Sequence, residues 1–147
     1  MWEEWSEWAD FVKSHESLSL TPYQCPAGVW TIGYGHTGPD VTGRSTRITT
    51  ERAEGLLAGD MGEAMAQAME LSPSLRMQAP RRIMAVSDFC FNAGPGNYAK
   101  STLRKRVNEG QWNLAALENA KWVYGGGKKL NGLIRRRATT SKWLKEG

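Results

Sequence analysis

The sequence predicts an α+β fold, in which a small β-hairpin lobe is joined to a larger all-helical lobe. A helical pattern opens the chain over residues 2–14, a hairpin pattern follows over residues 18–36, and the patterns after residue 51 are all helical. The length of 147 residues suits one domain. We expect residues 1–16 and about 61–147 to form the helical lobe, and about 17–60 to form the β lobe with a linking helix.

The first helix is predicted to be amphipathic. Trp2, Trp5, Trp8 and Val12 recur near one face at the 3.6-residue period of an α-helix. We interpret the tryptophans as core residues, with a membrane-interface role as the alternative. Glu16 falls at the end of this pattern.

The hairpin has a strand at residues 17–24, a turn at Cys25-Pro26-Ala27-Gly28 and a second strand at residues 29–34. Proline second and glycine fourth fit a type I turn, and the β-branched and aromatic residues that follow favour a strand. Alternation in a straight strand would put Thr31 on one face with Gly33 and Gly35, which leaves an open shelf. We therefore expect one carboxylate, one thiol and one hydroxyl to converge on a single cleft: Glu16, Cys25 and Thr31.

Helical patterns dominate the rest of the chain. A short third strand is predicted at residues 47–49, followed by a helix at 51–71. We expect that helix to break or bend near Gly59-Asp60, because it contains three glycines and each costs about 1 kcal/mol relative to alanine. Cys90 lies on an apolar helical face, so we expect it in the core. Further helices are predicted at 79–92, 103–108, 114–122 and 132–145, with a turn at 93–97 and a loop at 125–127.

The spacing of Glu16, Cys25 and Thr31 resembles the catalytic signature of phage-type lysozymes, the endolysins of T-even and lambdoid phages. That signature is Glu, eight residues, Asp or Cys, five residues, Thr. The family reads roughly E-G-x-x-L-x-x-Y-x-D-x-x-G-x-x-T-I-G-Y-G-H-T around it, and here Ser17 replaces the glycine and Cys25 the commoner aspartate. The matching positions are Glu16, Leu20, Tyr23, Gly28, the run 31–37, and later the segments 91–94, 101–104, Trp122 and 132–137.

The resemblance implies a lysozyme-like fold with the active-site cleft between the two lobes. It also implies a muramidase that hydrolyses the β-1,4 bond between N-acetylmuramic acid and N-acetylglucosamine. Such hydrolysis requires a proton donor for the leaving oxygen, which is the role we assign to Glu16. Cys25 and Thr31 would activate water or assist. The biological role implied is that of a phage or prophage endolysin in host cell lysis.

Three roles are open for Cys25. A cysteine with its ordinary pKa of about 8.5 is mostly protonated at neutral pH, so a catalytic thiolate requires a site that lowers this pKa. The thiolate could act as base or nucleophile. Alternatively, Thr31 orients the water and Cys25 contributes little, or Cys25 is chemically inert or oxidised.

The resemblance adds residues around the catalytic three. Thr37, Phe91 and Thr102 are predicted to bind substrate. We interpret His36 as a structural residue near the site, and we expect one of Arg135, Arg136 and Arg137 to orient the Glu16 carboxyl. No His or Cys pair has zinc-ligand spacing, so we expect no metal and no cofactor.

Net charge is +4, and the basic residues gather at the end of the chain. Such asymmetry suggests a polyanionic partner. We expect peptidoglycan as substrate, possible contact of the basic C-terminal helix with anionic lipopolysaccharide, no nucleic acid and a monomer. The sequence as given shows neither a signal peptide nor an apolar run long enough to span a membrane. We therefore expect synthesis in the host cytoplasm and action on the periplasmic cell wall after release by another route.

Three functions other than hydrolysis are alternatives. A lytic transglycosylase would use no water and would leave an anhydro sugar. A wall-binding module would have lost turnover with the catalytic aspartate. A nucleic-acid binder would explain the basic tail, but not residues 13–37.

Overall fold

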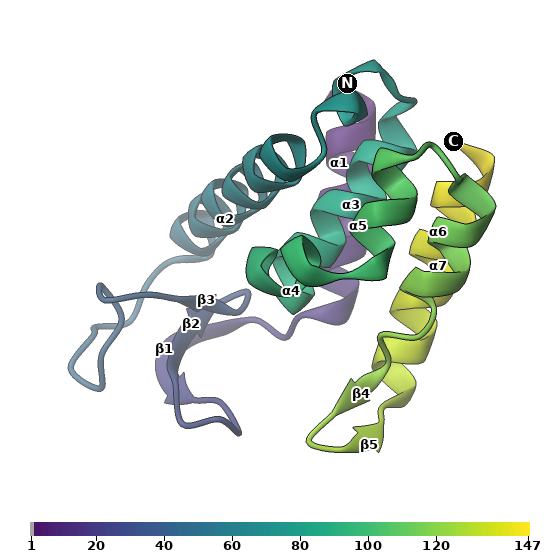
Figure 1. The fold of residues 1–147 in the computed structure, drawn as a ribbon. Helices are drawn as coiled ribbons and strands as arrows, with labels where there is room; N and C mark the ends of the chain where they lie inside the picture. Colours follow the sequence, from purple (N-terminus) through teal and green to yellow (C-terminus); the bar gives the residue numbers. More distant parts are fainter. Residues whose placement is uncertain (1) are drawn as a thin grey trace. The chain divides into compact units, whose positions relative to one another are not determined.

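The computed structural model describes residues 2–147 and divides into two compact units. One unit comprises the residues up to Trp8 together with Glu63–Gly147, and the other comprises Ala9–Gly62. Two helices, α1 (Trp2–His15) and α2 (Thr50–Leu71), each contribute residues to both units (Figure 1).

The Ala9–Gly62 unit contains an antiparallel sheet of three strands with β2 in the middle. The strands are β1 (Ser19–Gln24), β2 (Trp30–Gly33) and β3 (His36–Thr37). The predicted hairpin is therefore confirmed. The predicted strand at residues 47–49 is wrong, because this segment contributes one backbone hydrogen bond, from Ile48 N–H to Leu20 O at 2.9 Å, and forms no ladder.

A tight turn joins β2 to β3. Gly33 and Gly35 have φ values of 68° and 78°, in the left-handed region where side chains are strained. The predicted straight strand through Tyr34 is wrong, because these glycines let the chain reverse. The expected open shelf is consequently replaced by a turn, and His36 lies opposite Ile32 in the sheet.

Helix α2 is continuous through Gly59, so the predicted break is wrong, whereas the alternative of a bend stays a prediction. Gly59 has open space where a side chain would be, so no close neighbour requires a glycine at this position. An apolar stripe along α2 holds the helix together despite its glycines, because burial of that stripe outweighs their cost. Its buried residues are Ala53, Leu57, Met61, Ala64 and Ala68.

The larger unit is helical. Within it α3 packs beside α7, and α6 packs beside both α5 and α7 (Figure 1). The predicted turn at 93–97 is only partly right, because helix α4 begins at Pro95, directly after Gly94. The predicted loop at 125–127 is the connection of a two-stranded hairpin. The elements are η1 (Pro73–Met77), α3 (Pro80–Ala93), α4 (Pro95–Lys100), α5 (Thr102–Asn108), α6 (Trp112–Asn119), β4 (Tyr124–Gly125), β5 (Lys128–Lys129) and α7 (Asn131–Glu146).

The core of the helical unit centres on α3. Every residue from Ile83 to Cys90 is buried, which confirms the predicted core position of Cys90. Trp8 is also fully buried, as predicted, and its indole Nε1 donates to Asp88 Oδ1 at 3.1 Å. The side chain of Trp2 lies outside the described part of the structure.

Candidate active site

The turn between β1 and β2 positions Cys25. Gly28 N–H donates to Cys25 O at 2.8 Å, and Cys25 N–H donates to Val29 O at 3.0 Å. The first of these bonds closes the predicted β-turn, which is confirmed. The Cys25 thiol is half-exposed, and hydrogen bonds at the backbone of Val29 and Ala27 tie it to the turn.

Hydrogen bonds in this turn lower the pKa of the Cys25 thiol. The largest contribution is a backbone hydrogen bond at Val29, followed by one at Ala27 and a smaller one from the Thr31 hydroxyl. Partial burial acts in the opposite direction but is outweighed. Donors that favour the ionised form make a thiolate more accessible here than in a free cysteine.

Thr31 lies at the centre of the three-stranded sheet. Tyr23 of β1 and Thr37 of β3 are both directly opposite it, so the three side chains share one face. The Thr31 side chain is buried, and its hydroxyl donates to Val29 O at 3.0 Å. A hydroxyl has one proton, so Thr31 either keeps this bond or donates to the Cys25 sulfur. The structure thus brings Cys25, Thr31 and Thr37 together.

Glu16 follows the last residue of α1, and its N–H donates to Val12 O at 2.9 Å. Its carboxyl lies against Gly35 in the β2–β3 turn. A Cβ placed on Gly35 would be 3.1 Å from Glu16 Oε2, which is tighter than normal side-chain packing. The absence of a side chain at Gly35 therefore leaves the space that the Glu16 carboxyl occupies.

His36 connects β3 to its surroundings. Its Nδ1 lies 2.8 Å from Asp60 Oδ2 in α2, and its Nε2 lies 3.0 Å from Asp40 Oδ2. Burial alone would lower the pKa of His36, but the hydrogen bonds and charges of Asp60 and Asp40 together raise it. The same contact lowers the pKa of Asp40. These contacts hold β3 against α2.

The other predicted site residues belong to the helical unit. Phe91 is half-buried, and Thr102 is exposed in the first turn of α5. Arg135 is exposed, whereas Arg136 and Arg137 are buried. Arg136 forms a bidentate ion pair with Asp88, and Arg137 donates to Asn92 Oδ1 at 2.6 Å.

Sequence reasoning missed Asp40, Asp60, Asp88 and Asn92. Asp88 carried a usable signal, because a carboxylate within the apolar face of a buried helix requires a partner. Asp40 and Asp60 carried none, since acidic residues in a loop and in an amphipathic helix are ordinarily solvated. Over residues 2–147, no group of three His, Cys, Asp or Glu side chains is arranged to hold a metal ion. No described helix has both the length and the apolar character needed to cross a bilayer.

Comparison with known proteins gives consistent matches. A family model described as phage lysozyme matches residues 13–140. An endolysin of Acyrthosiphon pisum secondary endosymbiont phage 1 is 37% identical over 131 residues, covering 86% of each chain. A SAR-endolysin of Enterobacteria phage P21 is 33% identical over 123 residues, covering 83% of this chain and 72% of the relative.

Solved structures agree with the sequence matches. The muramidase domain of SpmX from Asticaccaulis excentricus superposes with a TM-score of 0.81 at 31% identity, covering 96% of both chains. An endolysin from Escherichia coli O157:H7 phage FAHEc1 gives a TM-score of 0.79 at 28% identity, covering 95% of this chain and 91% of the other. The predicted lysozyme-like α+β fold is therefore confirmed.

Proposed function

The chain belongs to the phage lysozyme family, and we propose that its reaction is carried by Glu16, Cys25 and Thr31. Family membership makes it a glycoside hydrolase of the muramidase type, an endolysin that acts on peptidoglycan. The bond cleaved is the β-1,4 linkage between N-acetylmuramic acid and N-acetylglucosamine.

Glu16 is the general acid. Cleavage of a glycosidic bond needs a carboxylic acid that protonates the leaving oxygen. The half-buried position of Glu16, with its carboxyl held against the backbone of Gly35, supports this role, because such packing limits the orientations of the side chain. A fixed orientation keeps the proton donor ready for the scissile oxygen.

Cys25 is the base that activates water. As water attacks the anomeric carbon, its proton passes to the Cys25 thiolate, the glycosidic bond breaks, and the leaving oxygen takes the proton of Glu16. The observation that carries this assignment is the set of hydrogen bonds, from the turn backbone and from Thr31, that lowers the pKa of Cys25. Thr31 holds the sulfur in place and Thr37 extends the polar face toward the substrate.

The remaining assignments concern partners and location. Phe91 and Thr102 line the substrate path, and the enzyme acts as a monomer on the cell wall in the periplasm. The exposed basic residues of α7 support contact with anionic lipopolysaccharide of an outer membrane. They are Arg135, Lys142 and Lys145.

Clearing of permeabilised Gram-negative cells tests the assignment. Glu16→Gln should lower the rate by a factor on the order of 10²–10⁴, the usual contribution of a general acid. Glu51→Gln is the matched control, because Glu51 is exposed at the start of α2. Retained clearing by Glu16→Gln would reject Glu16 as proton donor, and anhydro sugars in the product masses would reject hydrolysis.

A further inference from the structure

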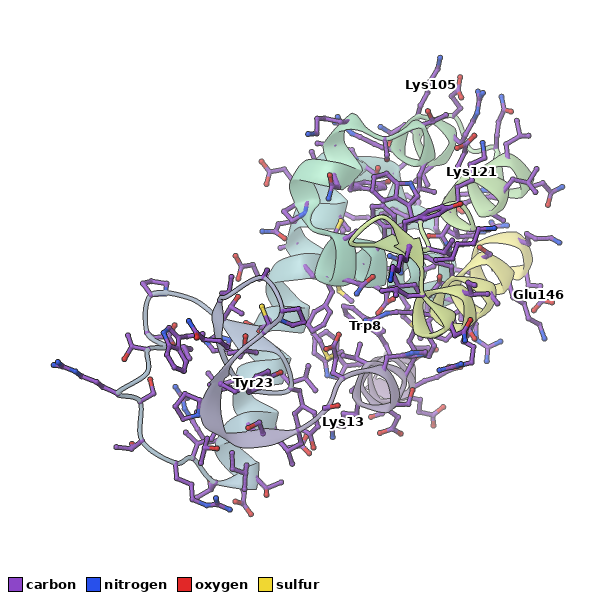
Figure 2. The ribbon with its side chains drawn as sticks, turned by 90° about the horizontal axis from the view of Figure 1, so that it is seen from below. Trp8, Lys13, Tyr23, Lys105, Lys121 and Glu146 are labelled. Atoms are coloured by element: carbon purple, nitrogen blue, oxygen red, sulfur yellow. The ribbon has the colours of Figure 1, made fainter. Side chains whose placement is uncertain are left out.

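Lys13, which is labelled in Figure 2, lies in the last turn of α1 and contacts two other elements. Its Nζ lies 2.6 Å from Glu54 Oε2 in the second turn of α2 and 5.7 Å from the centre of the Tyr34 ring. Tyr34 belongs to the tight turn between β2 and β3 and directly precedes Gly35. We call Lys13, Tyr34 and Glu54 the Lys13 cluster, and all three residues belong to the Ala9–Gly62 unit.

Both contacts of the Lys13 ammonium are attractive. The distance to Glu54 is that of a charge-assisted hydrogen bond, and a cation within about 6 Å of a ring centre is attracted by the face of the ring. The hydrogen bond with Glu54 raises the pKa of Lys13, so the ammonium is charged at neutral pH. The side chains of Lys13 and Glu54 are 29% and 43% exposed, however, and exposed ion pairs usually contribute little to stability. A role for this pair therefore depends on where it lies.

The β2–β3 turn that carries Tyr34 is also the turn that faces Glu16. A Cβ on Gly35 would meet Glu16 Oε2, and Glu16 directly follows α1. A Cβ on Gly33 would be 3.5 Å from Ala53 Cβ, which is ordinary van der Waals contact, so the other end of the turn lies against α2. The end of α1, the turn and the start of α2 are therefore joined by a closed set of contacts.

Within this set, Lys13 contacts both the turn and α2 from a position next to Glu16. Residues three apart are neighbours on a helix surface, and Lys13 precedes Glu16 by three positions. The N–H of Glu16 donates to Val12 O at 2.9 Å, which connects Glu16 to the last turn of α1. Helix ends fray, so contacts from this turn to its surroundings limit its movement. The Lys13 cluster thus holds the turn that precedes Glu16 and the backbone of Gly35 in one arrangement.

We propose that Lys13 is a positioning residue for the general acid and acts through its contacts with Glu54 and Tyr34. This proposal rests on the function proposed above, in which Glu16 protonates the leaving oxygen. Lys13 touches no reacting atom in this role, but restricts the movement of the β2–β3 turn relative to the end of α1. A proton donor must lie within hydrogen-bond distance of the atom that it protonates. Displacement of the Glu16 carboxyl therefore lowers the rate of the chemical step more than the affinity for substrate.

Steady-state kinetics on solubilised peptidoglycan test the proposal. Glu54→Gln removes the charge and keeps the shape of the side chain. It should lower kcat by about tenfold and leave KM within about twofold, since a misplacement of about 1 Å can cost up to about 10²-fold in rate. Lys13→Met removes the ammonium and keeps an unbranched stem, so it should lower kcat by a similar factor. Lys13→Arg should keep kcat within about twofold of wild type, because a guanidinium also pairs with a carboxylate and lies over a ring.

Glu7→Gln is the matched control. Glu7 also lies on α1 and forms an ion pair of 3.0 Å with Arg81 of α3, and its side chain is 39% exposed. Glu7→Gln should lower Tm about as much as Glu54→Gln does, but should leave kcat unchanged. Wild-type kcat in Glu54→Gln would overturn the proposal. An equal loss of kcat in Glu7→Gln and Glu54→Gln would also overturn it, because that loss would come from general destabilisation. If Lys13→Met fails to fold, Glu54→Gln still decides, since it changes only a partly exposed carboxylate.

NMR signals of the Gly35 and Glu16 backbone amides give a readout that does not depend on turnover. Both signals should shift in Glu54→Gln and stay in place in Glu7→Gln, and unshifted signals in Glu54→Gln would overturn the proposal. Failure of the positioning role and failure of the catalytic assignment are distinguishable. Unchanged kcat in Glu54→Gln together with an inactive Glu16→Gln rejects only the positioning role. Retained clearing by Glu16→Gln rejects the catalytic assignment, whatever the amide signals of Glu54→Gln show.

Discussion

At the scale of single residues, the structure shows a turn that favours the thiolate form of Cys25. A cysteine in place of aspartate looked unfavourable, because an ordinary thiol is mostly protonated at neutral pH. The turn supplies backbone donors at Val29 and Ala27, and Thr31 adds a hydroxyl. Each of these hydrogen bonds favours the thiolate. The sequence leaves three roles open for Cys25, and a thiolate supports the role of base.

The pH profile of kcat/KM should report the ionisation of Cys25. Because the pKa of Cys25 is lowered, the rise of activity with pH should have its midpoint below about 8.5, the reference value for a thiol. Cys25→Asp should move this rise toward lower pH and keep much of the activity, and Cys25→Ser should remove the rise along with most of the activity.

Thiol alkylation gives an independent check, because Cys90 is buried and Cys25 is half-exposed. Activity that survives at a Cys25 shown by mass spectrometry to be modified would refute a direct role of the thiol.

Gly35 is expected to position Glu16. Gly35→Ala would put a methyl group 3.1 Å from Glu16 Oε2 and strain a residue at φ 78°. The left-handed conformation alone should cost roughly 1–2 kcal/mol of stability. Gly110→Ala is the control, because Gly110 has φ 69° with open space around it. Both variants should lose similar stability in urea unfolding, but only Gly35→Ala should lose kcat. Equal kcat in the two variants would exclude the positioning role.

At the scale of secondary-structure elements, His36 ties β3 to α2. When His36 is protonated, both ring nitrogens donate, one to Asp60 and one to Asp40. Because its pKa is raised, the contact stabilises the fold fully below the ordinary histidine pKa of about 6.5. The contribution is lost as pH rises through the raised pKa. The pKa of Asp40 is lowered by its hydrogen bond with His36. The stability that the Asp40 carboxylate contributes is therefore lost only as the pH falls through this lowered pKa.

His36→Gln should therefore destabilise the protein most near pH 5, by about 1.5–3 kcal/mol, the usual range for hydrogen bonds to charged groups. The difference in Tm from wild type should shrink toward pH 9. Asp60→Asn should produce the same pH dependence. Because both substitutions remove the same contact, the double variant should be destabilised by less than the sum of the two single variants. A Tm difference that does not change between pH 5 and pH 9 would contradict the charged contact.

The elements show what the sequence could and could not predict. The β1–β2 hairpin followed from local chemistry, since Pro26 and Gly28 fit a turn between two strand-like runs. The reversal at Gly33 and Gly35 did not, because glycines within a strand pattern are equally typical of an open face or a turn. Helix α2 ran through Gly59 because its apolar stripe continues on both sides, and local propensity was too weak to end it.

At the scale of the whole molecule, the contacts that join distant parts of the chain were the ones that the sequence did not reveal. Asp88 of α3 accepts hydrogen bonds from Trp8, 80 positions earlier, and from Arg136, 48 positions later. Trp8 was predicted to be core and Arg136 to lie near the site, but no spacing rule relates them to Asp88. The three residues connect α1, α3 and α7 within the helical unit.

This network should be the most sensitive point of the helical unit. Asp88 and Arg136 are almost fully buried, and two hydrogen bonds of 2.8 Å join them. Asp88→Asn breaks the ion pair with the buried Arg136 guanidinium, which should cost about 3–5 kcal/mol in urea unfolding, the usual range for breaking a buried pair. Trp8→Phe removes the hydrogen bond from Trp8 to Asp88. The loss of that bond should lower the free energy of unfolding by about 1 kcal/mol.

Replacing both Asp88 and Arg136 distinguishes the energy of their ion pair from the packing energy of each side chain. Breaking a buried pair is more costly than removing it, since one unpaired charge is worse than none. Asp88→Asn combined with Arg136→Met should therefore be less destabilised than the sum of the two single variants, by at least about 1 kcal/mol in a double-mutant cycle. Strict additivity would mean that each side chain stabilises the unit through separate contacts.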